Sequence, residues 1–215
     1  MHRPTLPALL ALVLTGCAGI GTYRRTTVDP VAVIHGPSFD ELAVSTDYGV
    51  VFLGRGTKSG RVEFSVWFAD GENREEGVIE PVGGGLFATG AEILLPAVPL
   101  AYESPPPGSV VLVRGRREGQ PFEVEARIAR EPRVSGILLE SSRELNALED
   151  AELGSGVFVN VPGQELRLLG LLSGRLELDG RRYVTAVGPE DLWRLVVHRR
   201  NSDRPRRWVY REDIL

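Results

Sequence analysis

Histidine and cysteine, whose side chains act as base and nucleophile near neutral pH, are rare in this 215-residue sequence. Its histidines are His2, His35 and His198, and Cys17 is its only cysteine. Ser155 stands between two glycines. Acyl transfer by a serine needs a base within hydrogen-bond reach and a group that orients that base. Histidine is the usual base because its pKa lies near neutrality, so the three histidines decide whether Ser155 can react.

Metal and cofactor chemistry finds little support in the sequence. A metal site needs clustered histidine, cysteine or carboxylate ligands, and the histidines here are scattered. We therefore expect no metal ion and no cofactor. Lys58 could form a serine–lysine dyad with Ser155, although the glycine-rich residues 54–60 are more typical of an exposed turn. The same segment does not match a phosphate-binding loop, because Thr57 rather than glycine precedes Lys58.

The N-terminus has the anatomy of a secretory signal. Arg3 gives it a basic start, residues 6–14 form a short apolar run, and small residues precede Cys17. The apolar run is well short of the ~20 residues that span a bilayer. Residues 14–17, Leu-Thr-Gly-Cys, resemble the lipobox of bacterial lipoproteins, which are cleaved before the cysteine and acylated on it. The alternative is an ordinary signal peptide followed by an incidental cysteine.

The lipoprotein resemblance implies a location. It implies several acyl chains, palmitate among them, on Cys17, and a single chain alone would bind a membrane only reversibly. Ala18 rather than aspartate follows the cysteine, which in proteobacterial lipoproteins usually means passage to the outer membrane. We therefore expect a body that faces the periplasm, with a surface-exposed location as the alternative. The net charge of −4, or −5 without Arg3, argues against nucleic acid as a partner.

The rest of the chain is dominated by a hydrophobic period of two. Residues 62–68 and 122–128 alternate apolar with polar side chains, which predicts half-buried strands. Residues 110–113 and 166–172 are nearly continuous apolar runs and fit strands buried on both faces. The Asp-Gly pair at 179–180 favours a tight hairpin turn. Together these patterns predict an all-β barrel or sandwich.

One helix is expected near the C-terminus. Pro189 suits the first helical position, and Glu190 and Asp191 place negative charge in the first turn. Arg199 and Arg200 fall in the last turn, where positive charge is favourable.

The prolines at 105–107 cannot continue a strand or a helix, so we interpret them as the linker between two β halves. The predicted organisation comprises a signal peptide (1–16), a lipidated flexible tether (17–30), a first β-barrel half (31–103), a second β-barrel half (104–188) and a C-terminal helix with a basic tail (189–215).

The order of these elements resembles the trypsin-like (chymotrypsin-fold) serine peptidases. Residues 107–115 are similar to the strand that opens the second barrel of that family. Residues 152–159, followed by the run at 166–174, are similar to its nucleophile segment and the next strand. Residues 183–187 and the helix from Pro189 match its last strand and C-terminal helix. The resemblance implies an all-β fold of two packed antiparallel β-barrels with a C-terminal helix.

The nucleophile position implied by this resemblance is ambiguous. Agreement with Val157 and Phe158 places it at Leu153, which has no hydroxyl, whereas a register shifted by two residues places it at Ser155. The vestigial nucleophile segment consists of Glu152, Leu153, Gly154, Ser155 and Gly156.

The base and the acid of the family have no matching residue. The turn that should carry the histidine falls around residues 54–60, which contain none, and the aspartate position falls near Gly85. His35 precedes that turn, and His198 lies in the last helix. We therefore predict that the protein is not an enzyme but a pseudoprotease. The alternative is an active trypsin-like serine endopeptidase that uses Ser155.

The function that follows is a membrane-anchored lipoprotein with a binding or structural role in the cell envelope. Its inter-barrel groove would hold an extended peptide, so we expect a peptide or an envelope protein as partner. If the resemblance is convergent, another β-barrel serving as an envelope structural subunit is the alternative. The sequence does not define the oligomeric state.

A basic tail with Trp208 and Tyr210 completes the sequence. It could meet anionic lipid headgroups or an acidic partner. The alternative is a solvated tail whose aromatic side chains pack back on the barrel. Its arginines are Arg199, Arg200, Arg204, Arg206, Arg207 and Arg211.

Overall fold

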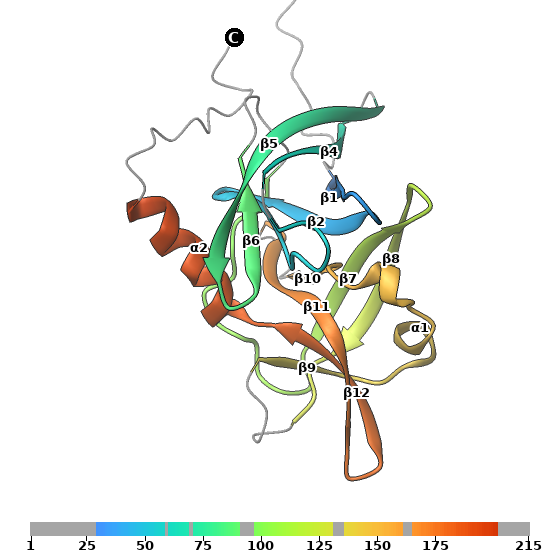
Figure 1. Ribbon diagram of the computed structural model, residues 1–215. Helices are drawn as coiled ribbons and strands as arrows, with labels where there is room; N and C mark the ends of the chain where they lie inside the picture. Colours follow the sequence, from blue (N-terminus) through green and yellow to red (C-terminus); the bar gives the residue numbers. More distant parts are fainter. Residues whose placement is uncertain are drawn as a thin grey trace, which may run out of the picture.

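The computed structural model describes residues 29–58, 60–68, 71–90, 97–130, 136–160 and 165–201, with residues 200 and 201 described by their backbone alone. These residues form two antiparallel β bodies and a C-terminal helix, α2, that packs against strands of both (Figure 1). Within these ranges, no helix combines the length and the apolar character needed to cross a membrane.

The first body is a closed barrel with the strand order β1-β2-β3-β6-β5-β4. Its interior is filled by fully buried side chains that include Ile34, Phe52 and Phe64. Burial of such apolar surface is the dominant favourable contribution to folding. The strands are β1 (Asp29–His35), β2 (Glu41–Thr46), β3 (Gly49–Phe52), β4 (Arg61–Phe68), β5 (Gly71–Gly83) and β6 (Leu86–Thr89).

The second body is a six-stranded sheet with the order β8-β7-β10-β11-β12-β9. Its outer strands approach each other through an isolated bridge between Ile128 and Leu139 and a 2.8 Å bond from Ala129 N to Leu138 O. The strands are β7 (Val110–Arg117), β8 (Gln120–Arg127), β9 (Ile137–Glu140), β10 (Gly156–Val159), β11 (Arg167–Leu178) and β12 (Arg181–Val187). The predicted fold class is confirmed, with the second barrel present as this curled sheet.

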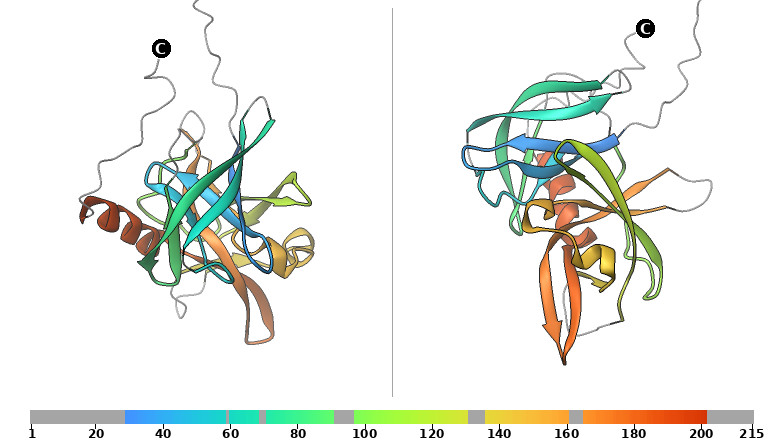
Figure 2. Two further views of the ribbon diagram at one scale, coloured as in Figure 1. Left: turned by 45° about the horizontal axis from the view of Figure 1, so that its top comes forward. Right: turned by 90° about the vertical axis from the view of Figure 1, so that its right-hand side faces the viewer.

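The hydrophobic patterns explain the strands that form. In β4, Val62 and Phe64 are buried while Arg61 and Glu63 are exposed, as a period of two requires. In β11 the apolar run 168–172 is buried without interruption, because the strand lies between the second core and the core shared with α2. Beyond that run the β11–β12 hairpin projects from the body (Figures 1 and 2).

Short helices follow the second body's outer strand. α1 (Arg143–Asn146) begins at Ser142, whose side chain accepts a bond from Leu145 N at 3.1 Å. A 3-10 turn, η1 (Asp150–Glu152), leads directly into β10.

The predicted C-terminal helix is confirmed as α2 (Pro189–Asn201). Leu192, Leu195 and Val196 on its inner face are buried in one cluster with Val44 of the first body and Phe158 of the second. α2 therefore fixes the two bodies against each other.

A buried arginine also joins the two bodies. Arg116 of β7 lies with its guanidinium carbon 3.5 Å from the ring centroid of Trp67 and pairs with Asp29 at the start of β1. Its side chain is 5% exposed, so the attraction to the aromatic face is little screened by water. This contact connects β7 with β1 and β4 across the interface.

Candidate functional site

The segment that resembles a nucleophile region forms a tight turn around a buried carboxylate. Glu152 is 3% exposed, and its two oxygens accept bonds from Arg117 Nε and from Glu149 N, the latter at 2.5 Å. The Glu149 side chain in turn accepts from Glu152 N, which completes a capping box around η1. The hydrogen bond to Glu152 raises the pKa of Arg117. This turn is therefore stabilised by the ion pair between Glu152 and Arg117 and by the hydrogen bonds between residues 149 and 152.

Neither candidate nucleophile presents a reactive group to solvent. Leu153 is partly buried against the second core, and its backbone N donates to Asp150 O at 3.2 Å. Ser155 is fully buried, and its Oγ donates to Glu152 O at 2.6 Å. A nucleophilic hydroxyl needs an adjacent base, whereas this hydroxyl is occupied by a main-chain acceptor.

The first barrel lies directly on this turn. Gly154 has φ +98°, and a Cβ placed there would lie 2.6 Å from the carbonyl oxygen of Leu42 in β2. On the other side, a Cβ at Gly115 would lie 2.4 Å from Ser155 Oγ. Two glycines thus allow the backbone of β2 and that of β7 to close over residues 154 and 155.

The loop after β3, which falls where the resemblance placed a histidine turn, is organised at residues 55–57 by a carboxylate that the sequence analysis missed. Glu41 is 4% exposed and accepts backbone hydrogen bonds from Arg55 (2.6 Å), Gly56 (2.9 Å) and Thr57 (2.6 Å). Successive backbone N–H groups of this kind form an anion-binding nest. The available signal was an acidic residue at the start of an apolar strand, 13 residues before Gly54 and its glycine-rich turn.

Three arginines from different elements form hydrogen bonds with residues 148–152. Arg55 of the first body donates from Nη1 to Asp150 O at 2.5 Å, so it bridges the two bodies. Arg175 of β11 donates to Leu148 O and lies 3.2 Å from Asp150 Oδ1. With Arg117 on β7, these contacts hold residues 148–152 from three sides of the chain. Their partners are distant in sequence, and no local pattern identifies them.

The described histidines form separate contacts. His198 Nε2 lies 3.0 Å from Glu80 Oε2 and helps to dock α2 on β5. His35 Nδ1 lies 3.2 Å from Asp40 Oδ1, and its Nε2 lies 2.8 Å from Oγ of the fully buried Ser65. His35 thus stands between a serine and a carboxylate, but the serine is Ser65 and not Ser155.

Ser65 joins His35 and Glu72 in this second cluster. Ser65 Oγ donates its single proton to Glu72 Oε1 at 2.5 Å, so His35 Nε2 must donate to Ser65. The Ser65 hydroxyl therefore bridges His35 and Glu72 through two hydrogen bonds.

The remaining predicted positions are dispersed. Gly85 lies in the turn between β5 and β6, and a Cβ at the preceding Gly84 would lie 2.7 Å from Asp191 Oδ1 of α2. Lys58 is exposed whereas Ser155 is fully buried, so the lysine–serine dyad is not assembled. In the part of the chain that the structure describes, no group of three or more histidine, cysteine or carboxylate side chains is placed to hold a metal ion. Cys17 and the basic tail beyond residue 201 lie outside the described residues.

Comparison with solved structures identifies the architecture. The chain is similar to an inactive mutant form of Rv3671c from M. tuberculosis H37Rv, with 13% identity, a TM-score of 0.58, and coverage of 82% of this chain and 89% of that one. The MamO protease domain from Magnetospirillum magneticum shares 18% identity with a TM-score of 0.56, over 81% of this chain and 97% of that one. Deg5 shares 14% identity with a TM-score of 0.54, over 78% and 87%. No protein-family model and no curated protein match the sequence. The fold is therefore trypsin-like.

These comparisons contradict our prediction that the protein is not an enzyme. The similar structures include proteases, so the fold found here also occurs in active enzymes. At 13–18% identity, the likeness shows the fold and does not establish activity. The prediction was wrong because it treated the residue types found at a few aligned positions as sufficient to exclude an activity.

Proposed function

We propose that this protein is a lipid-anchored envelope protein whose trypsin-like domain binds an extended peptide along the free edge of β11. Peptide binding is a step that a peptidase and a binding protein share, so the proposal does not depend on catalysis. The observation that carries it is the pairing of β11. On one edge residues 171–178 of this strand pair with β12, and on the other edge its pairing with β10 ends at Leu171.

The register identifies which groups face the open edge. Asp179 (φ +50°) and Gly180 (φ +73°) form a two-residue hairpin turn, so Leu178 and Arg181 are a hydrogen-bonded pair. Because hydrogen-bonded and non-bonded pairs alternate, Leu176 also bonds to β12 while Arg175 and Glu177 direct their backbone groups to the other edge. No other described strand pairs with β11 beyond residue 172.

This open edge lies next to the arginine contacts with residues 148–152. Arg175 contacts Leu148 O and Asp150 with its side chain, and the backbone of Leu172 bonds to Ser155 O at 2.9 Å. An unpaired strand edge supplies main-chain hydrogen bonds to an extended peptide, and neighbouring side chains supply selectivity. The edge, η1 and Arg55 together suit such a ligand.

A proline substitution tests the proposed edge. Arg175→Pro and Arg175→Ala both remove the guanidinium, but only proline also removes the backbone N–H that faces the edge. We expect short synthetic peptides from an array to bind the detergent-solubilised full chain and the alanine variant, and to bind the proline variant about tenfold more weakly. Equal binding by the two variants, or binding of no peptide, would reject the edge as a peptide site.

Membrane attachment is tested separately at Cys17. The proposal is supported by the lipobox resemblance of residues 14–17, by the signal anatomy before it, and by the absence of a second cysteine. Metabolic labelling with a palmitate analogue should mark the wild type and not Cys17→Ala, and the variant should lose its lipid anchor. Labelling that persists in Cys17→Ala would place acylation elsewhere.

A second candidate function is a serine endopeptidase that uses Ser155, and the likeness to protease structures favours it. It requires the turn at residues 152–155 to rearrange, because Ser155 Oγ is buried and bonded to Glu152 O. A fluorophosphonate probe discriminates between the two functions. Labelling of the wild type that disappears in Ser155→Ala would establish the endopeptidase.

A further inference from the structure

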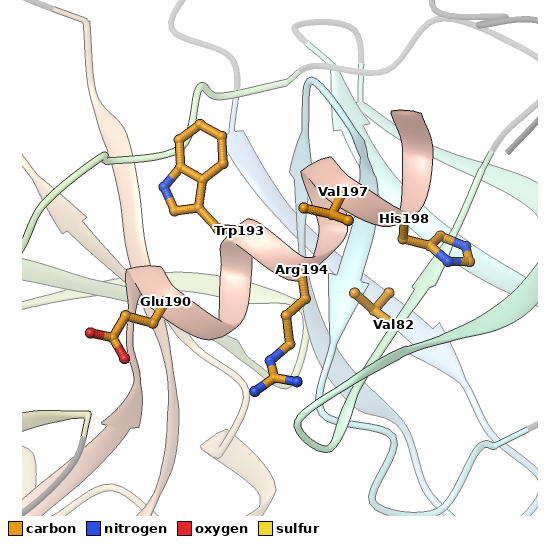
Figure 3. Close-up of a pocket in the computed structure, with 6 residues that line it drawn as sticks. All are labelled: Val82, Glu190, Trp193, Arg194, Val197 and His198. Carbon is orange, nitrogen blue, oxygen red and sulfur yellow. The ribbon is translucent and has the colours of Figure 1, made fainter. Parts of the chain in front are cut away.

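The hollow between α2 and β5 does not select a ligand by its charge. Figure 3 shows the side chains that line it, among them Glu190 and Arg194. Arg194 also pairs with Asp191 at 3.2 Å. Because charges of both signs lie at this hollow, its potential favours neither an anion nor a cation. The open edge of β11 differs, since its charges follow an order along one strand.

The open edge of β11 carries two side chains of opposite charge. The backbone groups of Arg175 and Glu177 face this edge, and their side chains share one face of the hairpin because alternate residues of a strand do so. These side chains are 44% and 65% exposed. Leu176, which lies between them, is half-buried and belongs to the opposite face. A strand that pairs with this edge therefore meets an arginine, a leucine and a glutamate in turn.

The strand that best complements this edge has the sequence of the edge itself. In an antiparallel pair, the residue opposite Glu177 comes first along the incoming strand and the residue opposite Arg175 comes last. Opposite charges stabilise such cross-strand pairs, so the first residue should be basic and the last acidic, with an apolar residue between them opposite Leu176. Residues 175–177, Arg-Leu-Glu, have this order. A second copy of the chain therefore matches the edge.

The same charges select one register for two copies of β11. Residues that face the edge must lie opposite each other, so Arg175 can meet Arg175, Glu177 can meet Glu177, or each can meet the other. The first two registers place like charges opposite each other, which is destabilising. The third forms two Arg175–Glu177 pairs about a two-fold axis at Leu176. It also places Leu178 opposite Gly174, where the nearest atom to an added Cβ is Thr185 Oγ1 at 3.5 Å.

We propose that two copies of the protein pair antiparallel in this register through the open edges of β11, and that the pairing regulates the edge by excluding other peptides. The regulatory part rests on the proposed peptide site, because both partners use the same backbone groups of Arg175 and Glu177. The contact is related by a two-fold axis, so it closes into a dimer and does not extend into a fibre. The hairpin projects from the body, which brings its strands to the surface of the molecule (Figure 2).

A disulfide across the two-fold axis tests the register. Leu176→Cys places two thiols in a non-hydrogen-bonded pair, whose Cα atoms lie about 4.5 Å apart, within the range of a disulfide. Leu178→Cys is the matched control, because it shares the face and the strand but lies more than about 13 Å from its counterpart. Mild oxidation of the detergent-solubilised full chain, with micelles in excess, should give about tenfold more covalent dimer for Leu176→Cys. Equal amounts, or no dimer beyond that of the wild type with its single Cys17, would overturn the proposal.

Charge reversals test the pairing without a covalent bond. Arg175→Glu and Glu177→Arg each replace two attractive pairs by two repulsive ones, so each should weaken self-association about tenfold in sedimentation equilibrium of the full chain in density-matched detergent. An equimolar mixture of the two variants should associate again, because the glutamates of one then face the arginines of the other. Arg181→Glu changes the charge of an exposed residue on the other strand of the hairpin and should have no effect.

The mixture is decisive for the charge pairs. If the two variants do not associate with each other, or if Arg181→Glu weakens association equally, the pairing is rejected. Arg175 also bonds to Leu148 O, so the thermal unfolding of each variant is measured alongside. The disulfide test leaves Arg175 unchanged and decides the register if Arg175→Glu does not fold.

Peptide competition separates this inference from the proposed function. Array peptides that bind the wild type should not bind the oxidised Leu176→Cys dimer, and should bind again after reduction. Unchanged binding by the oxidised dimer would overturn the regulation. Selective crosslinking of Leu176→Cys with no peptide bound to the reduced chain would keep the pairing and reject the peptide site. Peptide binding without selective crosslinking would reject the pairing and keep the peptide site.

Discussion

Ser155 and Ser65 are both fully buried serines, but they lie in opposite chemical surroundings. Ser155 occupies the segment that resembles a nucleophile region, and its hydroxyl bonds to the carbonyl of Glu152. Ser65 lies in β4, where no motif points to chemistry, yet it contacts His35 and, through it, Asp40. The serine in the motif-like segment is therefore not the serine that contacts a histidine.

The difference shows that a nucleophile is defined by its neighbours in space. Ser65 lies beside an imidazole and a carboxylate, but its hydroxyl donates to Glu72 and its side chain is fully buried. Ser155 lies beside the open edge of β11, but its partner is a neutral carbonyl. Neither site combines accessibility with a base, which is the combination that acyl transfer needs.

The largest effect is expected from the carboxylate that shapes the Ser155 turn. Glu152→Ala removes the acceptor of both Arg117 Nε and Glu149 N, and should lower the free energy of unfolding by about 3 kcal/mol in urea titrations. Glu152→Gln keeps an acceptor for Glu149 N and should lose less. An alanine variant as stable as the wild type would show that the turn does not depend on this buried charge.

The contact between the Ser155 turn and the first barrel gives the next effect. Gly154→Ala places a methyl group 2.6 Å from Leu42 O at a positive φ, and should cost about 2 kcal/mol of unfolding free energy. Gly119→Ala is the control, because Gly119 also has positive φ but nothing lies within 4 Å. Thermal unfolding should show a clearly larger loss at position 154, and equal losses would remove the evidence for close packing of the two bodies.

Alanine substitutions at Ser65 and Ser155 compare the contributions of the two hydroxyls to stability. Ser65→Ala leaves both His35 Nε2 and Glu72 without their partner and should cost about 1.5 kcal/mol. Ser155→Ala removes a single neutral hydrogen bond and should cost about 1 kcal/mol or less. Nitrogen chemical shifts of the His35 ring should change in Ser65→Ala and stay constant in Ser155→Ala. A shift in both would mean that the two regions are coupled.

The smallest effect is a pH-dependent one on β5, the strand that supplies Glu72. Burial raises the pKa of Glu75, so its carboxylate form is disfavoured in the folded state. The folded state then binds the proton more tightly, and stability falls as pH rises through the unfolded and then the folded pKa. Glu75→Gln should therefore be a few tenths of a kcal/mol more stable than the wild type at pH 7, with no difference in acid. A wild type that is the more stable at pH 7 would contradict this burial effect.

Much of the fold could be predicted because its signals are local. The period of two at residues 62–68 and 122–128 gave β4 and β8, and the continuous run at 166–172 gave the buried part of β11. The Asp-Gly pair at 179–180 gave a hairpin turn, and Pro189 gave the start of α2. Each of these patterns depends on residues within a few positions of one another, so the backbone period and the turn geometry are contained in the sequence.

The site could be predicted only in part. The segment at residues 152–156 stays a prediction. Glu41, Arg55 and Arg175 were not predicted, because they act on residues about 15 to 100 positions away. The same limit applies to His35, whose contact with Ser65 follows from the pairing of β1 with β4. Such contacts form when distant strands close into one barrel, and no local propensity specifies them.

The sequence by itself determined which segments become strands, where α2 begins, and that histidine and cysteine side chains are few. Only the tertiary structure decided that Ser155 is closed in beneath Gly115, that Leu42 covers Gly154, and that β11 keeps one open edge. The physical reason is that period and composition are properties of neighbouring residues. Burial and the pairing of hydroxyl, imidazole and carboxylate groups exist only after two bodies have packed together.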